Sequence, residues 1–180
     1  MKWKIAAALV CAIFAAGVAA RADAPSPAPS AAAVDDATQK AIAANYALGC
    51  TAAFDPSDAN LDAAFANLAP TFVNIDPSGK QTPRDEVVNL AKQQMKMLKA
   101  KSCDHALESF VASDPATIVV VNTLHVAGTI QAPGGAHDFD LTDKASDTWK
   151  NAGGKWQQLQ SKDLHVLVKI DGNVVEDIGS

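Results

Sequence analysis

The strongest indication of the fold in this 180-residue chain is the segment Asp147-Thr148-Trp149-Lys150-Asn151-Ala152-Gly153-Gly154-Lys155-Trp156. Its two tryptophans stand on either side of Asn151-Ala152-Gly153-Gly154, a run of turn-forming residues. Such a run between two segments of alternating apolar and polar residues is typical of a hairpin loop. The stretch therefore predicts two antiparallel strands, over residues 136–150 and 155–170, that meet at this turn.

Two further strands are expected before the hairpin, over residues 103–112 and 117–130. Asp114-Pro115 separates these two strands, and Pro133-Gly134-Gly135 separates the second of them from the hairpin. Proline and glycine punctuate strands in this way because proline lacks a backbone donor and glycine adopts turn conformations freely. The C-terminal part of the chain thus predicts an antiparallel meander.

Helical patterns fill the part of the chain before the meander. A helix is expected over residues 36–54, because Asp35-Asp36 supply an N-cap and apolar residues such as Ile42 and Tyr46 recur at helical spacing. Residues 61–68 predict a short second helix that stops near Pro70, and residues 71–75 predict a brief strand.

A third helix is expected to begin at Thr82-Pro83-Arg84-Asp85, with Thr82 as the N-cap and Pro83 in the first turn. It is expected to run through Leu98 to a last turn that holds Lys99 and Lys101. Helices followed by a meander indicate an α+β fold in which the helices cover one face of a curved sheet.

The N-terminus has the features of a secretion signal. Lys2 and Lys4 precede an uncharged apolar run over residues 5–20, and Ala20-Arg21-Ala22 fits the small-x-small pattern for cleavage after Ala22. We expect a signal peptide of Gram-negative type at 1–22, a flexible Pro/Ala/Ser leader at 23–34 and one domain at 35–180. The alternative is a permanent membrane anchor, but the apolar run is shorter than the roughly 20 residues of a spanning helix.

Charge and cysteine content describe the chain that cleavage would leave. That chain keeps 12 basic and 20 acidic residues, and its net charge of −8 argues against nucleic acid as a partner. Since cleavage removes the apolar run, we also expect no membrane association after it. Cys50 and Cys103 would remain, and an even number of cysteines in an oxidising periplasmic or extracellular compartment favours a disulfide. Two buried free thiols are the alternative.

The D-x-W, Gly, x-W pattern of residues 147–156, the Asp76-Pro77-Ser78-Gly79 turn and the order of the elements resemble the nuclear transport factor 2-like superfamily. The SnoaL-like branch, related to steroid delta-isomerases, is the most similar. The resemblance spans about residues 38–170. It implies a cone-shaped, cystatin-like roll in which N-terminal helices pack in a curved, mostly antiparallel sheet around an open, mostly apolar pocket.

The resemblance also implies where catalytic groups would lie. Asp76 stands where steroid isomerases carry the Asp of an Asp-Pro turn as general base. The tyrosine that binds the oxyanion falls near Cys50, one helical turn from Tyr46, and the acid that assists it falls near Ala145. Lys162 stands six residues after Trp156, where many relatives place a pocket-facing histidine. Since both oxyanion donors are replaced, the sequence does not favour a steroid isomerase.

Strand alternation gives a separate prediction of the pocket lining. Over residues 137–149 the odd positions carry the aromatic residues, so Asp143, Asp147 and His137 are expected on the concave side with Trp149. Asp76, Asp143, Asp147 and His137 are the catalytic candidates. The remaining pocket candidates are Tyr46, Phe72, His105, His125, Trp149 and Lys162. Histidine spacing and glycine patterns indicate neither a metal site nor a cofactor.

Two classes of function agree with these features. The first is a periplasmic or secreted protein that binds a small apolar or amphipathic molecule in the cone, forms a homodimer through its sheet, or does both. The second is a cofactor-free isomerase, lyase or cyclase in which Asp76, Asp143 or Asp147 works with a histidine as acid and base. The sequence does not decide whether the protein is an enzyme.

Overall fold

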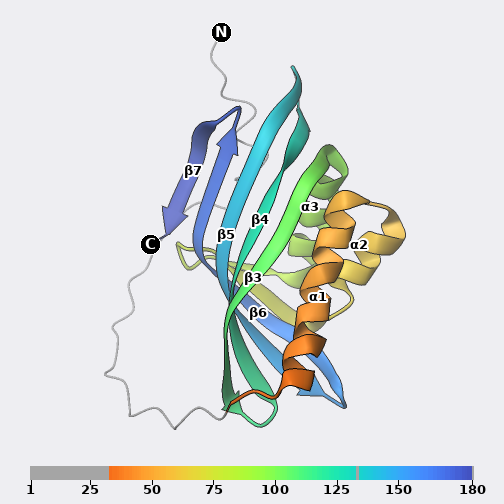
Figure 1. The fold of residues 1–180 in the computed structure, drawn as a ribbon, viewed down its shortest axis with the longest axis vertical. Helices are drawn as coiled ribbons and strands as arrows, with labels where there is room; N and C mark the ends of the chain where they lie inside the picture. Colours follow the sequence, from red (N-terminus) through yellow and green to blue (C-terminus); the bar gives the residue numbers. More distant parts are fainter. Residues whose placement is uncertain (1–32, 133, 180) are drawn as a thin grey trace.

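The computed structural model describes residues 33–132 and 134–179, which form three helices and one curved seven-stranded sheet (Figure 1). The helices gather on one side of the sheet, and β7 lies at its far edge. The fold is therefore the α+β roll expected from the sequence. The predicted signal peptide at 1–22 and most of the leader at 23–34 lie outside the described residues.

The sheet is built on four long strands that run antiparallel in chain order: β3 (Leu98–Asp114), β4 (Thr117–Ala132), β5 (Gly135–Ala152) and β6 (Lys155–Ile170). Three shorter strands complete it: β1 (Leu68–Ile75), β2 (Gln81–Pro83) and β7 (Asn173–Gly179). β1 pairs with β6 in parallel and with β2 in antiparallel orientation. β7 pairs with the C-terminal part of β6. The sheet is thus mostly antiparallel, as predicted, while β7 is an additional strand that the sequence analysis missed.

The first helix, α1 (Asp36–Phe54), has the predicted bounds. Asp35 caps it, because its Oδ1 accepts a hydrogen bond of 2.9 Å from the backbone amide of Thr38. α2 (Asp58–Phe65) ends earlier than predicted. Residues 68–70 belong to β1 instead, since Leu68 already pairs with Gln158 of β6.

The predicted ends of the third helix are wrong. α3 spans Arg84–Met97, and Thr82 does not cap it. Thr82 is buried in β2, where it pairs with Asn74 of β1, so the strand pairing takes the residue that the capping pattern assigned to the helix. Lys99 and Lys101 belong to β3, because the chain pairs with β4 from Leu98 onward.

The core lies where α1 crosses the concave face of β4 and β5. Ile42 and Tyr46, one helical turn apart on α1, pack with Ile118, Val120 and Trp149 of the sheet. The predicted disulfide is present: Cys50 of α1 is bonded to Cys103 of β3. Helix α1 is therefore fixed to the sheet by both apolar packing and a covalent bond. Among the described helices, none is long and apolar enough to span a membrane.

Candidate functional site

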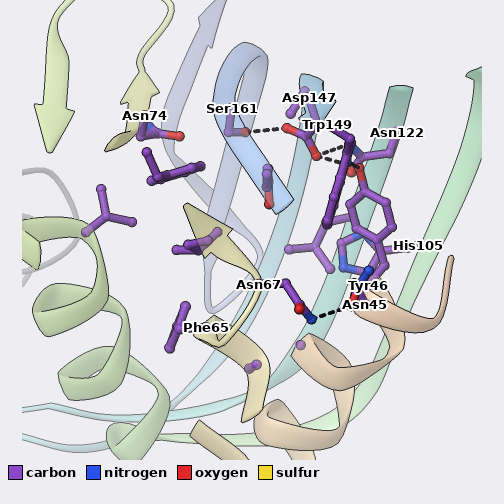
Figure 2. Close-up of a pocket in the computed structure, with 18 of the residues that line it drawn as sticks. Asn45, Tyr46, Phe65, Asn67, Asn74, His105, Asn122, Asp147, Trp149 and Ser161 are labelled. Atoms are coloured by element: carbon purple, nitrogen blue, oxygen red, sulfur yellow. Dashed lines mark hydrogen bonds between the residues drawn. The ribbon is translucent and has the colours of Figure 1, made fainter. Parts of the chain in front are cut away.

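A cavity of about 230 Å³ lies between the helices and the concave face of the sheet (Figure 2). Apolar and aromatic side chains form much of its wall, and amide and carboxyl groups enter it from β1, β4, β5 and β6. The lining residues are Asn45, Tyr46, Gly49, Ala64, Phe65, Asn67, Leu68, Phe72, Asn74, Val87, His105, Asn122, Leu124, Asp143, Ala145, Asp147, Trp149, Gln158 and Ser161. Apolar walls with a few converging polar groups are typical of small-molecule sites.

Tyr46 connects α1 to the polar end of this cavity. Its hydroxyl donates a hydrogen bond of 2.7 Å to Oδ2 of Asp147 and accepts one of 3.0 Å from Nε1 of Trp149. The Tyr46 and Trp149 rings meet edge to face, with centroids 5.5 Å apart. Burial, followed by the neighbouring Asp147 carboxylate, raises the pKa of Tyr46, so the phenol stays protonated and acts as a donor.

Asp147 is the most completely hydrogen-bonded of the carboxyl groups in the cavity. Its Oδ2 also accepts a hydrogen bond of 2.9 Å from Asn122, and its Oδ1 accepts one of 2.6 Å from Ser161 (Figure 2). The side chain is 3% exposed. Burial raises the pKa of Asp147, while the hydrogen bonds from Ser161, Tyr46 and Asn122 lower it. These donors fix the position of the carboxyl group.

Alternation along β5 brings Asp143 and Ala145 to the same face as Asp147. Asp163 of β6 stands directly opposite Ala145, at a point where the pairing of the two strands shifts. Ala145 therefore stands at the position that the resemblance assigns to an acid. Asp143 and Asp147 lie two positions away on either side of it, and Asp163 lies across the strand pair.

The carboxyl groups of Asp143 and Asp163 bind protons more readily than ordinary aspartates. Burial, with Asp163 and Asp147 nearby, raises the pKa of Asp143 to about 8. Burial also raises the pKa of Asp163 to about 6, although Asn74 donates a hydrogen bond of 3.0 Å to its Oδ2. Oδ1 of Asp143 is buried and, among the described residues, has no hydrogen-bond partner. Asp143 therefore holds a proton to higher pH than an ordinary aspartate.

His105 enters the cavity from β3 and packs against Tyr46, with ring centroids 4.9 Å apart. Burial lowers the pKa of His105, and Asn122 opposes this shift. Its Nδ1 is buried and lacks a partner within the described part of the chain. Since His105 pairs with Leu124, and Leu124 with Asp143, the histidine and the carboxyl group lie on one row across three strands.

Asp76 lies in the turn after β1 and is 7% exposed. Its Oδ1 accepts hydrogen bonds from the amides of Ser78 and Lys80, at 2.8 and 3.0 Å, so half of the carboxyl group stabilises the turn. Its Oδ2 is buried and unpartnered among the described groups. Asp76 is not a lining residue, but its charge is close enough to Asp163 to raise that pKa.

Three of the predicted site residues lie away from the cavity. His137 is near the other end of β5, about 33 Å from Asp147 at the usual rise per residue, and its Nδ1 lies 2.8 Å from Oδ2 of Asp171. His125 is on the outer face of β4, and its ring nitrogens lie 3.8 Å from Asp104 and 3.4 Å from Asp140. Lys162 is exposed on β6. The structure brings Tyr46, Phe72, His105, Asp143, Asp147 and Trp149 together.

The sequence analysis missed six polar residues that line the cavity, and it missed Asp163, which bonds to one of them. The six are Asn45, Asn67, Asn74, Asn122, Gln158 and Ser161. Asp163 is seven residues after Trp156, one beyond the position that the resemblance indicated. The shifts in pairing between β5 and β6 turn Ser161 and Asp163 toward the cavity and Lys162 away from it. Across the described residues, no three His, Cys, Asp or Glu side chains are arranged to hold a metal ion.

Comparison with known proteins finds similarity in structure. No protein-family model matches the sequence. The search of curated proteins also finds no match. A conserved protein from Planctomyces limnophilus DSM 3776 superimposes with a TM-score of 0.61 at 16% identity, over 76% of this chain and 99% of that one.

Two other solved structures carry descriptive names. A nuclear transport factor 2-like protein from Cytophaga hutchinsonii has a TM-score of 0.54 at 15% identity, over 69% of this chain and 95% of that one. A ketosteroid isomerase-like protein from Erwinia carotovora atroseptica has a TM-score of 0.52 at 16% identity, over 72% and 98%. At these identities the similarity shows the fold.

Proposed function

Since the chain has the nuclear transport factor 2-like fold, we propose that it binds a small amphipathic molecule in the cavity between its helices and sheet. One observation carries the proposal: a cavity of about 230 Å³ combines aromatic walls with a fixed carboxyl group at one end. An apolar body would displace water from the walls, and a polar group would meet the carboxyl end.

Gly49 offers a way to block the cavity without disturbing the core. It lines the cavity from α1, and a Cβ atom added there meets nothing within 4 Å. Gly49→Leu should therefore fill part of the space, and it also favours the helix. Ala44→Leu adds a similar side chain at an exposed position of the same helix and is the matched control.

The indole N–H of Trp149 reports on occupancy because it lies in the cavity wall. We expect its NMR resonance to shift when the wild-type protein or Ala44→Leu is titrated with benzyl alcohol, a small amphipathic probe, and to stay unchanged in Gly49→Leu. A Trp149 resonance that is equally unresponsive in wild type and Ala44→Leu would overturn the binding proposal. An equal response in Gly49→Leu would place the binding elsewhere.

Secretion and self-association complete this proposal. Removal of residues 1–22 would deliver the domain to an oxidising compartment, which agrees with the Cys50–Cys103 disulfide. The outer face of the sheet carries neighbouring valines, with Val111 of β3 paired with Val119 of β4 and Val121 next along that face, which supports a homodimer. The intact mass of the exported protein tests cleavage after Ala22, and light scattering tests the dimer.

Catalysis by the same cavity is a second candidate function, favoured by one pair of groups. The pKa of Asp143 is raised to about 8, the pKa of His105 is lowered by burial, and Nδ1 of His105 has no partner among the described residues. A proton donor and a proton acceptor in one cavity are what a cofactor-free isomerase or lyase needs. Among the original acid candidates, Asp147 is fully engaged by Tyr46, Asn122 and Ser161, so Asp143 is the proposed acid.

A small cyclic β,γ-unsaturated ketone tests this candidate, because its conversion to the conjugated ketone moves one proton between two carbons and is followed by ultraviolet absorbance. Conversion by wild type that is lost in Asp143→Asn and retained in Asp140→Asn, a carboxylate on the outer face of β5, would support catalysis. No conversion, or conversion that Asp143→Asn leaves unchanged, would count against it.

A further inference from the structure

Four carboxyl groups lie close together at one end of the cavity, and two of them, Asp143 and Asp147, line it. Asp143 and Asp147 project from one face of β5, Asp163 projects from β6 opposite the residue between them, and Asp76 follows β1 beside β6. All four residues are buried or partly buried. Negative charge is therefore concentrated at this end of the cavity, in its wall and close to it.

The hydrogen bonds of these carboxyl groups are unevenly distributed. Asp147 receives donors on both oxygens, from Tyr46, Asn122 and Ser161. Oδ1 of Asp143 and Oδ2 of Asp76 are buried and, within the described residues, have no donor. A buried carboxyl oxygen without a donor is costly, so a ligand in the cavity is expected to supply a donor to Oδ1 of Asp143, which lines it.

Positive charge is absent from the described residues that line the cavity, since none of them is Lys or Arg. From α3, Arg84 contacts the backbone oxygen of Leu68 and the carboxylate of Asp85. From β5, Lys144 pairs with Glu108 on the outer face. The other titratable groups facing Asp143 are Asp147, Asp163, His105 and Tyr46, and none of these supplies a permanent positive charge.

The wall beside the acids is aromatic. Tyr46 and Trp149 meet edge to face next to Asp147, and Phe65 and Phe72 also line the cavity. Aromatic faces attract cations as well as apolar groups. An occupant with a positive group and an apolar body would therefore find a partner for each part.

We propose that the natural ligand is a small organic cation, an amine or amidine on an aromatic or aliphatic body, whose N–H groups donate to Asp143, with Asp147 and Asp163 close by. This inference rests on the proposed ligand-binding function and names its ligand class. An organic ammonium fits better than a metal ion, because among the described side chains no three His, Cys, Asp or Glu residues could ligate a metal. Binding of the cation displaces the proton held by Asp143.

Benzylamine and benzyl alcohol form a matched pair for the test, since they differ mainly in the charge of one group. At pH 8, we expect wild-type protein to bind benzylamine at least tenfold more tightly than benzyl alcohol, with the Trp149 indole resonance as the readout. This ratio should approach one in Asp143→Asn and stay at the wild-type value in Asp140→Asn, which removes a carboxylate from the opposite face of the same strand.

Proton release gives a second readout. Calorimetric titration in buffers of different ionisation enthalpy should show a proton released on benzylamine binding at pH 7, and none on benzyl alcohol binding. Equal or tighter binding of benzyl alcohol would refute the proposal that the ligand is a cation, but it would still agree with the proposed ligand-binding function. Failure of both compounds to bind would refute both proposals. A preference for benzylamine that survives in Asp143→Asn would refute Asp143 as the group that binds the cation.

Discussion

The phenol of Tyr46 on α1 and the carboxyl group of Asp147 on β5 are joined by a hydrogen bond of 2.7 Å, across 101 residues of sequence. The same hydroxyl accepts the indole N–H of Trp149. This bond links the helix that covers the cavity to the strand that forms its floor, so it connects the fold to the candidate site.

Replacement of Tyr46 by Phe should destabilise the domain by about 2 kcal/mol, because Asp147 loses a donor and Nε1 of Trp149 loses its acceptor in a buried place. Urea unfolding followed by tryptophan fluorescence measures the change. Ser113→Ala removes an exposed hydrogen bond to the backbone of Thr117 and should cost less than about 0.5 kcal/mol. An equal loss in the free energy of unfolding for the two variants would mean that the buried hydrogen bonds of Tyr46 stabilise the domain no more than an exposed one.

The Cys50–Cys103 disulfide closes a loop with a sequence separation of 53. Chain-entropy models give about 4 kcal/mol for such a loop, and removal of native disulfides typically costs 2–5 kcal/mol. The double variant Cys50→Ala/Cys103→Ala should therefore unfold at a clearly lower urea concentration than the oxidised wild type, and reduced wild type should behave like the variant. Thiol labelling of unreduced protein should find no free thiol at these positions.

Local patterns predicted the elements best. The bounds of α1 followed from a capping residue and one apolar stripe, and the inward side of β5 followed from alternation around Trp149. These signals depend on neighbours within a few residues, which the sequence contains directly. The disulfide could also be predicted from the sequence, because the prediction needed only the two cysteines that remain after cleavage and an oxidising compartment.

Pairing between strands was the main source of error. On β4 both alternating sets contain apolar residues, so the sequence could not show that Asn122 and Leu124 face the cavity and His125 the solvent. On β6 a shift in pairing turns Asp163 inward and leaves Lys162 exposed. Such irregularities depend on the partner strand, and a one-residue change reverses every side chain.

His105 lies in the cavity and His125 on the outer face of the sheet, so substitutions at the two positions should affect ligand affinity differently. His105→Phe keeps an aromatic ring against Tyr46 but removes the nitrogens from the cavity. It should change the affinity for benzylamine at least fivefold, about 1 kcal/mol. His125→Ala changes only the outer face of β4 and should leave the affinity within about twofold. A larger effect of His125→Ala than of His105→Phe would contradict the assigned faces of β3 and β4.

Stability should fall as the pH rises, because of Asp143. Burial and the neighbouring Asp163 and Asp147 raise its pKa in the folded protein to about 8, whereas an unfolded chain ionises near the ordinary value of 3.8. Between these two values the folded state holds a proton that the unfolded state has released, so the free energy of unfolding decreases with pH. The decrease should level off above about pH 8.

Asp143→Asn removes this dependence, since an amide has no proton to lose. Urea unfolding at pH 5, 6, 7 and 8 should give a steep loss of stability for wild type and a shallower one for the variant, with the remainder coming from Asp163, whose pKa is raised to about 6. Asp140→Asn, on the outer face, should keep the wild-type slope. Parallel slopes of the free energy of unfolding against pH for wild type and Asp143→Asn would exclude Asp143 as the group responsible. Since the same proton opposes a bound cation, benzylamine should stabilise wild type more at pH 8 than at pH 6.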